Sequence, residues 1–445
     1  MIDRAALADE ADAMLRELFP ICRSITGEGF RQSLEILGRY APMRQHDYPS
    51  GMKCFDWTIP PEWTIRDAYI ADSRGRRVID FRRSNLHVVS YSVPFRARMT
   101  LAELRGHLHT LPALPDAIPY RTSYYTREWG FCLSHRQLQA LDPQETYDVV
   151  VDSELADGYL TLADDVIRGD IAQEFLISTY CCHPSLANDN LSGVVLTVLL
   201  HRILTARRNR YSYRFLIAPE TIGVLVYLSQ NEAALRAITG GFVVATVGGP
   251  GPLGYKRTFL GDHLIDRAVL ETFQERGIEP KIYPFAPDGS DERQFSSPGF
   301  RIPMGTICKD KYYEYPSYHT SLDDLDFVSG KAIVATLEIY LGAIDRLEQE
   351  RIYVRRELRG ELHLGRHGLY PSTGGGIHQP GNTAGFRLDA EGVAADDLDP
   401  LLWCLFLMDG RHSLKDIVVR SRWPLAQIER LAGILVRAGL VEAVR

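Results

Sequence analysis

Long apolar runs are absent from this chain of 445 residues. A membrane-spanning helix needs about eighteen consecutive apolar residues, and no stretch of the sequence reaches that length. The opening segment, Met1 to Glu10, is charged and has a helical period, unlike a secretory signal. We therefore expect a cytoplasmic protein without a membrane partner.

Cysteine and basic charge are also scarce. The seven cysteines are an odd number without paired short spacings, which excludes a disulfide scaffold and favours reduced thiols. The formal net charge of -7 gives no electrostatic footprint for nucleic acid, so we expect no nucleic-acid partner. What is present is an ordinary globular composition, 45% apolar and 24% charged, with enough length for two or three domains.

Strand-like and helical patterns alternate between about residues 150 and 350. Buried strands are predicted by the apolar runs at 175–182, 215–218 and 242–247. Helical periods separate these runs and follow them at 191–208, 223–238, 264–276 and 330–350. This alternation is typical of the α/β class.

Residues 48–150 have a different character. Aromatic and β-branched residues alternate there with polar ones, and Pro and Gly are frequent, which predicts an inserted β-rich domain. The segment before it, from about residue 3 to 40, has two helical periods. We assign residues 1–47 and 151–355 to an α/β core and 48–150 to the insert.

The C-terminal part is predicted to be a separate module. A Gly-rich and polar stretch makes 356–397 a linker region, and residues 398–445 have the pattern of a small winged-helix module. A buried helix ends before a turn at Asp409-Gly410, Ser413 is an N-cap for a second helix, and Pro424 opens a third. The helices lack a basic stripe, so we expect dimerisation or recognition of a carrier or peptide rather than DNA binding. A homo-oligomer would form through the insert or this module.

Four side chains stand where strand-like runs end or in turn-rich loops. His183 and Asp189 follow the run at 175–182, Glu220 ends a shorter apolar run, and His319 lies in a loop. In open α/β sheets, ligands bind at the carboxyl ends of the strands. Two imidazoles and a carboxylate can hold zinc and leave a fourth position open for water, and Glu220 could serve as the general base.

Three of the singled-out residues also have structural interpretations. His183, next to a proline, fits a buried structural histidine equally well. Glu220 fits a buried ion pair or a charge at a helix N-terminus. Asp291 either holds a substrate ammonium group or is a solvated loop acid.

Two carboxylates follow His319 closely. Asp323 and Asp326 fit the role of orienting that imidazole, and they also fit as N-caps of the helix that follows. Cys181 and Cys182 lie at the end of a strand-like run, where thiols are usually buried and inert, so we leave them out of the ligand set.

Four motifs of this chain, in this order, resemble those of the zinc-dependent aminopeptidase superfamily, which includes di-zinc aminopeptidases and glutaminyl cyclases. They are His183-Pro-Ser-Leu-Ala-Asn-Asp-Asn-Leu-Ser-Gly193, Pro219-Glu-Thr-Ile-Gly223, Ser290-Asp-Glu-Arg-Gln-Phe295 and Tyr318-His-Thr-Ser-Leu-Asp-Asp-Leu-Asp326.

Three flanking phrases make the resemblance closer. The chain is similar from about residue 10 to 350 to bacterial aminopeptidase-like proteins that carry an inserted β domain and are often named for polysaccharide or natural-product biosynthesis. The phrases are Leu18-Phe-Pro-Ile-Cys-Arg-Ser-Ile-Thr-Gly27, Phe55-Asp-Trp-Thr-Ile-Pro60, and Thr122-Ser-Tyr-Tyr125 through Trp129-Gly-Phe-Cys132. This resemblance implies a zinc-aminopeptidase-like core with a mixed sheet flanked by helices.

The resemblance also implies roles for individual residues. His183 matches the first metal histidine, Asp189 the aspartate that bridges two metals, Glu220 the general base and His319 the last metal histidine. We expect Asp291, Arg293 and Tyr318, which belong to the matched motifs, to contact the substrate.

Two departures from the family pattern reduce the expected number of metals. The superfamily commonly has a second acid directly after the base, where this chain has Thr221. It also has an aspartate ligand after the next strand, where Val244-Ala-Thr-Val-Gly248 contains no carboxylate. His183, Asp189 and His319 remain as a set for one zinc ion per chain.

These observations favour a zinc-dependent hydrolase of an amide or peptide bond in a small aminoacyl or peptidyl substrate. Zinc-dependent acyl transfer or cyclisation, as in glutaminyl cyclases, is one alternative. The other is a non-catalytic scaffold that binds an amino compound, although pure binding would not need Glu220.

Overall fold

A computed structural model describes residues 3–369 and 397–444 of the chain. The described residues form two compact units, one of Met1–Gly169 with Glu174–Ile344 and the other of Asp170–Gln173 with Asp345–Arg445. Most of the range predicted to be a linker, 356–397, lies outside the described residues. In the described ranges, no helix combines the length and apolar character needed to cross a bilayer.

The first unit is built on an eight-stranded mixed sheet of order β1-β10-β12-β11-β13-β16-β14-β15. The central strands β12, β11, β13 and β16 are parallel. The strands β1 and β10 pair antiparallel, and β14 pairs antiparallel with β16 and parallel with β15. The strands are β1 (Arg44–Pro49), β10 (Tyr159–Ile167), β11 (Glu174–Tyr180), β12 (Ser212–Ala218), β13 (Ile238–Val243), β14 (Leu253–Lys256), β15 (Lys281–Tyr283) and β16 (Met304–Lys309).

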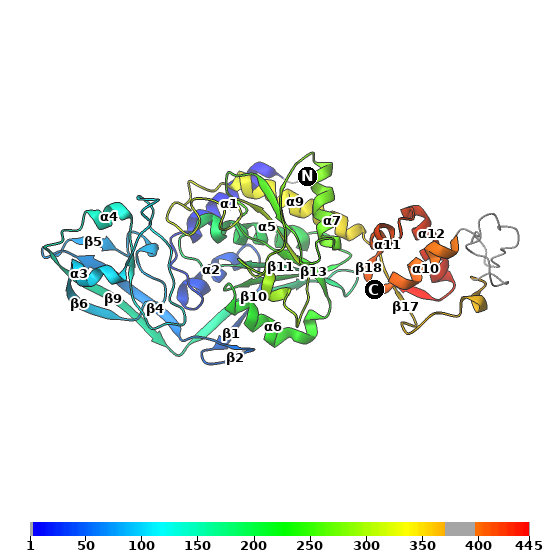
Figure 1. Cartoon of the computed structure of the whole chain (residues 1–445), viewed down its shortest axis with the longest axis horizontal. Helices are drawn as coiled ribbons and strands as arrows, with labels where there is room; N and C mark the ends of the chain where they lie inside the picture. Colours follow the sequence, from blue (N-terminus) through cyan, green and yellow to red (C-terminus); the bar gives the residue numbers. More distant parts are fainter. Residues whose placement is uncertain (1–2, 370–396, 445) are drawn as a thin grey trace. The chain divides into compact units, whose positions relative to one another are not determined.

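The central strands β11 and β12 are buried along their whole length because both of their faces are covered. Every residue of β11 and β12 is buried, as expected for parallel strands between two layers of helices. In Figure 1, α1, α5 and α9 lie on one side of this sheet and α6 on the other. The helices of this unit are α1 (Arg4–Leu18), α2 (Glu28–Gly38), α5 (Gly193–Thr205), α6 (Ile222–Leu235), α7 (Leu264–Glu275), α8 (Glu292–Phe295) and α9 (Gly330–Gln349), which runs into the second unit.

The inserted segment forms a four-stranded antiparallel sheet of order β5-β4-β9-β6. These strands appear in blue and cyan in Figure 1. They are β4 (Glu62–Ala71), β5 (Arg77–Asp80), β6 (Phe95–Thr100) and β9 (Thr146–Ala156). The same segment contains smaller elements: β2 (Lys53–Cys54), β3 (Trp57–Thr58), α3 (Leu101–Leu104), β7 (Leu108–His109), β8 (Phe131–Cys132) and α4 (His135–Gln139).

The second unit combines three helices with a three-stranded sheet of order β18-β17-β19. Its elements are β17 (Ile352–Arg355), α10 (Leu398–Leu407), β18 (Asp409–Ser413), α11 (Leu414–Ser421), α12 (Leu425–Arg437) and β19 (Val441–Ala443). Ser413 caps α11 by accepting the N–H of Asp416, as its position in the sequence predicts.

Two details of this unit differ from the sequence prediction. The residues Asp409-Gly410, predicted to be a turn, begin the strand β18. The strand β17 lies inside the range 151–355 assigned to the core, yet it pairs with β18 and β19. Both errors have one cause, because the pairing that defines these short strands joins segments more than fifty residues apart.

Candidate metal centre

Two neighbouring parallel strands bring His183 and Glu220 to the same edge of the sheet. Tyr180 at the end of β11 lies opposite Ala218 at the end of β12, so the residues that follow them emerge side by side. The backbone N–H of Glu220 donates to Sγ of Cys182 at 3.3 Å, which ties the two loops together. As a result, Oε2 of Glu220 lies 3.7 Å from Nε2 of His183.

The three side chains predicted to be ligands lie together. Ligand atoms of His183, Asp189 and His319 are all within 4.8 Å of one another, the one such cluster of His, Cys, Asp or Glu in the described part of the chain. Asp189 comes from a π-helical segment before α5 and His319 from the loop between β16 and α9. Nε2 of His319 is 3.0 Å from Oδ2 of Asp189.

The polar atoms of this cluster are suited to a cation. Nδ1 of His183 is buried without a hydrogen-bond partner, which is costly unless something else satisfies it, and the contact of Oδ2 of Asp189 is the one with Nε2 of His319 at 3.0 Å. The second oxygen of Asp189 accepts a hydrogen bond from the hydroxyl of Tyr180 at 2.7 Å. Two imidazoles and one carboxylate form a donor set that zinc accepts, so these residues fit the ion.

The protonation states of the ligands suit a metal as well. Burial lowers the pKa of His183 to about 4, so its imidazole is neutral at physiological pH. Burial alone would raise the pKa of Asp189, but His183, His319 and the Tyr180 hydroxyl outweigh it and lower that pKa to about 2. Neutral imidazole and ionised carboxylate are the forms that bind metals.

Asp323 supports the Asp189 loop rather than His319. Its carboxylate accepts the backbone N–H groups of Asn188 at 2.6 Å and Asp189 at 3.0 Å and the hydroxyl of Tyr315 at 2.9 Å. Burial raises the pKa of this carboxyl to about 7. The expectation that it orients the imidazole is wrong, because its oxygens are occupied by the loop that carries the neighbouring ligand.

Asp326 lies outside the site. Its side chain is exposed, and its backbone N–H donates to Asp324. Neither Asp323 nor Asp326 caps α9, whose first N–H, on Gly330, donates to Asp12 at 2.6 Å. The prediction that these two acids cap the following helix is therefore wrong, since Ser329 occupies the cap position and its Oγ accepts the N–H of Ala332 at 3.2 Å.

The segment Val244–Gly248, which has no carboxylate, is held by three polar side chains of the Asp189 loop. Asn190 accepts the N–H of Thr246, Ser192 that of Val247 and Asn188 that of Gly248, at 2.9 to 3.1 Å. These hydrogen bonds hold the backbone of the segment in place, and the three side chains add no candidate metal ligand.

Asp291 and Tyr318 lie behind the cavity wall. Asp291 is 1% exposed, and its Oδ1 accepts the N–H of Thr221 at 2.8 Å, so it supports the residue after Glu220. Burial raises its pKa to about 7. Tyr318 stacks on His319 with ring centroids 3.9 Å apart.

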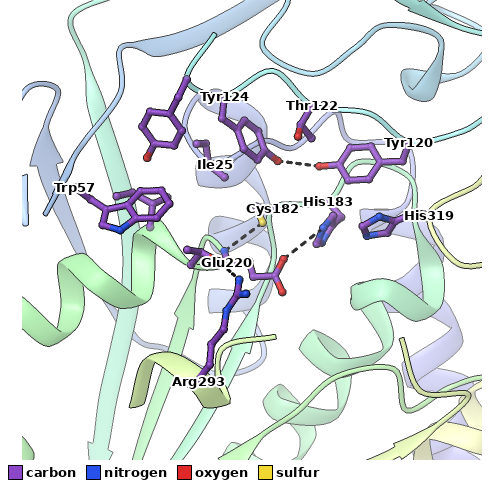
Figure 2. A pocket seen from close by; sticks show the side chains of 13 residues that line it. Ile25, Trp57, Tyr120, Thr122, Tyr124, Cys182, His183, Glu220, Arg293 and His319 are labelled. Carbon is purple, nitrogen blue, oxygen red and sulfur yellow. Dashed lines mark hydrogen bonds and ion pairs between the residues drawn. The ribbon is translucent and has the colours of Figure 1, made fainter. Parts of the chain in front are cut away.

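Glu220 and Arg293 face a cavity of about 320 Å³. Figure 2 shows Glu220 between Trp57 on one side and the two histidines on the other. Burial, followed by the charges of Asp291 and Asp189, raises the pKa of Glu220 well above its usual value. The lining consists of Ile25, Trp57, Tyr120, Thr122, Tyr124, Tyr125, Cys182, His183, Glu220, Thr221, Ile222, Arg293 and His319.

Two tyrosines from the inserted segment close the cavity over the metal ligands. The N–H of Tyr120 donates to the carbonyl of His319 at 2.8 Å, and its ring lies edge-on to both imidazoles at 5.2 Å. Its hydroxyl bonds that of Tyr124 at 2.9 Å (Figure 2). Our sequence reasoning missed their role, although Tyr124 lies in the matched phrase that begins at Thr122.

Arg23 is another supporting residue that sequence reasoning missed. Its fully buried guanidinium donates from Nε to the carbonyl of His183 at 3.0 Å and from Nη1 to that of Leu18 at 2.6 Å. Arg23 lies inside the matched phrase at 18–27, which was the available signal. It fixes the backbone at the first ligand.

Comparison with known proteins identifies the family. A family model described as a domain of unknown function (DUF4910) matches residues 12–350. The chain belongs to this family. A winged helix-turn-helix model matches residues 351–443. The chain is 43% identical over 431 residues to a Clostridium acetobutylicum protein, provisionally named a polysaccharide biosynthesis protein with an aminopeptidase-like domain, covering 97% of this chain and 95% of that protein.

Solved structures agree with this assignment. A crystal structure of a provisionally named peptidase from Clostridium acetobutylicum has a TM-score of 0.78 and 40% identity, covering 99% of this chain and 98% of that one. A zinc aminopeptidase from Bacillus subtilis has a TM-score of 0.56 at 12% identity, covering 76% and 95%, and so shows the fold alone. The aminopeptidase-like fold with a mixed sheet and the C-terminal winged helix, both expected from the sequence, are confirmed.

Proposed function

We propose that this chain is a mono-zinc hydrolase that cleaves an amide or peptide bond in a small aminoacyl or peptidyl substrate. The observation that carries the proposal is the cluster of three candidate ligand side chains, two of which, His183 and His319, line a cavity together with Glu220. The name of the Clostridium relative supports a substrate from polysaccharide biosynthesis. The aminopeptidase-like fold supports amide chemistry.

The metal and Glu220 would share the work of activating water. Zinc held by His183, Asp189 and His319 would lower the pKa of water toward neutrality and polarise the substrate carbonyl. Glu220 lies next to His183 and would accept the proton of the attacking water and deliver it to the leaving amine.

Tyr120 and Tyr124 would contribute a hydrogen-bond donor from the opposite wall. Burial raises the pKa of both hydroxyls well above the usual value, so both keep their protons. One hydroxyl donates to the other, and the accepting hydroxyl retains its own proton to donate. That proton is available to a substrate oxygen.

The proposal is tested by Glu220→Gln, which keeps the shape of the side chain but cannot accept a proton. Turnover should fall by roughly 10²- to 10⁴-fold, the usual contribution of general acid-base catalysis. The zinc content should stay at one ion per chain, measured by elemental analysis. Unchanged turnover, or a metal ratio near two, would contradict the proposal.

Labelled water separates hydrolysis from the acyl-transfer alternative. Hydrolysis in H₂¹⁸O places one ¹⁸O atom in the carboxylate product, whereas cyclisation or transfer to another acceptor does not. A screen of aminoacyl amides, acylated amino acids and short peptides with product mass analysis supplies the substrate for this measurement. A protein that binds these compounds without converting any of them would be the non-catalytic scaffold.

A further inference from the structure

The cavity beside the metal ligands has a cation on its wall. Apart from the imidazoles of His183 and His319, Arg293 is the only basic side chain among the described residues that line it. Arg293 belongs to the short helix α8, and its guanidinium points toward Glu220 in Figure 2.

The donors of Arg293 are largely unused by the protein. Its Nη2 donates to Oγ1 of Thr221 at 3.4 Å, which is a long hydrogen bond. Its Nε is buried without a partner. Among the described residues Arg293 forms no ion pair, so the guanidinium has the capacity to bind an acceptor from outside the chain.

The acids next to Arg293 are committed elsewhere. Asp291 holds the N–H of Thr221, and Glu292 bonds the hydroxyl of Thr306 and lies 3.7 Å from Nζ of Lys256. The cavity therefore has no spare carboxylate for a substrate ammonium group, since Asp189 is a metal ligand and Glu220 the base. Its free charged group is positive.

We propose that Arg293 binds a carboxylate of the substrate and so determines which side of the amide is recognised. The inference rests on the proposed amide hydrolysis and names its substrate class. The substrate is an N-acyl amino acid, or a peptide cleaved at its C-terminal residue, with the free carboxylate on the amine side of the bond. A planar guanidinium matches a carboxylate with two parallel hydrogen bonds, and one cation balances one unit charge.

The position of Arg293 relative to Glu220 agrees with this orientation. Arg293 contacts Thr221, the residue after Glu220, and Glu220 delivers a proton to the leaving nitrogen. In an amino acid the carboxylate is one carbon away from that nitrogen. Water adds its oxygen to the acyl carbon, the C–N bond breaks, and the amino acid leaves with the proton from Glu220 while Arg293 holds its carboxylate.

Binding measurements test Arg293 independently of turnover. N-acetylleucine and N-acetylphenylalanine, each compared with its carboxamide, are titrated into the zinc-loaded protein by calorimetry. The wild type should bind each acid about ten- to a hundredfold more tightly than its carboxamide, the range expected for hydrogen bonds to a charged group. Arg293→Gln should abolish this preference, and Arg293→Lys should retain part of it.

Arg127→Gln is the matched control. Arg127 is an exposed arginine that lines a neighbouring cavity with Trp57 and Tyr125, so its removal should leave the acid preference intact. The proposal is overturned if Arg293→Gln keeps the preference, or if the wild type binds acid and carboxamide equally or binds neither at millimolar concentration. An Arg293-dependent preference without cleavage would keep this inference and refute the hydrolase function instead.

Discussion

Two buried acids beside the candidate site differ from those of the second unit in how they are satisfied. In the second unit, Glu350 pairs with Lys415 at 2.8 Å and Asp397 pairs with Arg430. In the first unit, Asp291 and Asp323 beside the candidate site are equally buried, but among the described residues neither forms an ion pair. They hold backbone N–H groups of the loops that carry Glu220 and Asp189.

The difference separates a structural role from a functional one. An acid paired with a cation has its charge compensated within the fold. Burial without a cation makes the ionised form of an acid unfavourable, which raises the pKa of Asp291 and of Asp323 to about 7, and a positive group bound nearby would favour the ionised form. The candidate metal centre therefore lies where the fold leaves charge uncompensated, whereas the second unit relies on an apolar core.

Removal of one ligand should give the largest effect. His183→Ala or His319→Ala leaves two side chains where zinc needs at least three, so bound zinc should be lost almost completely. Elemental analysis of the purified variants measures this loss. His367→Ala, an exposed histidine of the second unit, should retain full occupancy. Full zinc occupancy in His183→Ala or in His319→Ala would show that the candidate site of the first unit does not bind zinc through these side chains.

A cavity in the apolar core should affect only the second unit. Leu435 on α12 is fully buried in the cluster around Leu401 and Leu431, so Leu435→Ala should cost about 2–5 kcal/mol of unfolding free energy. Denaturant titration followed by tryptophan fluorescence measures this cost. Val436→Ala, at an adjacent position that is 42% exposed, should cost far less. A loss of zinc in the Leu435 variant would show that the metal centre depends on this core.

Asp323→Asn should weaken zinc binding without abolishing it. An amide can accept only through one oxygen, so its NH₂ group would face either a backbone N–H or the Tyr315 hydroxyl. Loss of such a supporting contact typically lowers metal affinity by about 10- to 100-fold. Competition with a chelator measures the change. Asp326→Asn, at the exposed acid of the same loop, should leave the zinc affinity unchanged. An equal loss of zinc affinity in both variants would show that the overall charge of the loop, and not the contacts of Asp323, causes the change.

Regular patterns in the sequence were sufficient for the central part of the fold. The strands β11 and β12 overlap the predicted apolar runs over most of their length, whereas β13 (Ile238–Val243) overlaps the run predicted at 242–247 only at its last two residues. The strands β14 and β15 were not predicted, since they are short and polar or aromatic residues interrupt them. Their strand geometry depends on pairing with distant residues, which no local pattern encodes.

Residue types identified the site, but side-chain directions did not follow from them. His183, Asp189, Glu220 and His319 were found because their chemistry and their position after strands agree. Asp291 and Arg293 are two residues apart on one motif, yet one turns inward to Thr221 and the other faces the cavity. That difference arises from the turn of α8 and from packing, which a sequence does not display.

The smallest effect concerns the ion pair of Asp409 and His412 in the second unit. The carboxylate of Asp409 bonds Nδ1 of His412 at 3.0 Å and raises the pKa of that imidazole; Asp416 acts in the same direction, while burial and Arg420 oppose it. Because the folded His412 holds its proton more tightly than the unfolded one, its stabilising contribution is complete below about pH 6.5 and is lost as the pH rises through the folded pKa. The pair is partly exposed, so the loss should stay below about 1 kcal/mol.

Urea unfolding of the wild type and of His412→Gln at about pH 5.5 and about pH 8.5 measures this loss. The difference in unfolding free energy between the two proteins should shrink at the higher pH, and a difference that grows would contradict the assignment. Zinc should not alter this difference, because Asp409 and His412 already bond each other. Asp189 and His183 are also a carboxylate and an imidazole, but Nδ1 of His183 has no partner and is available to an ion.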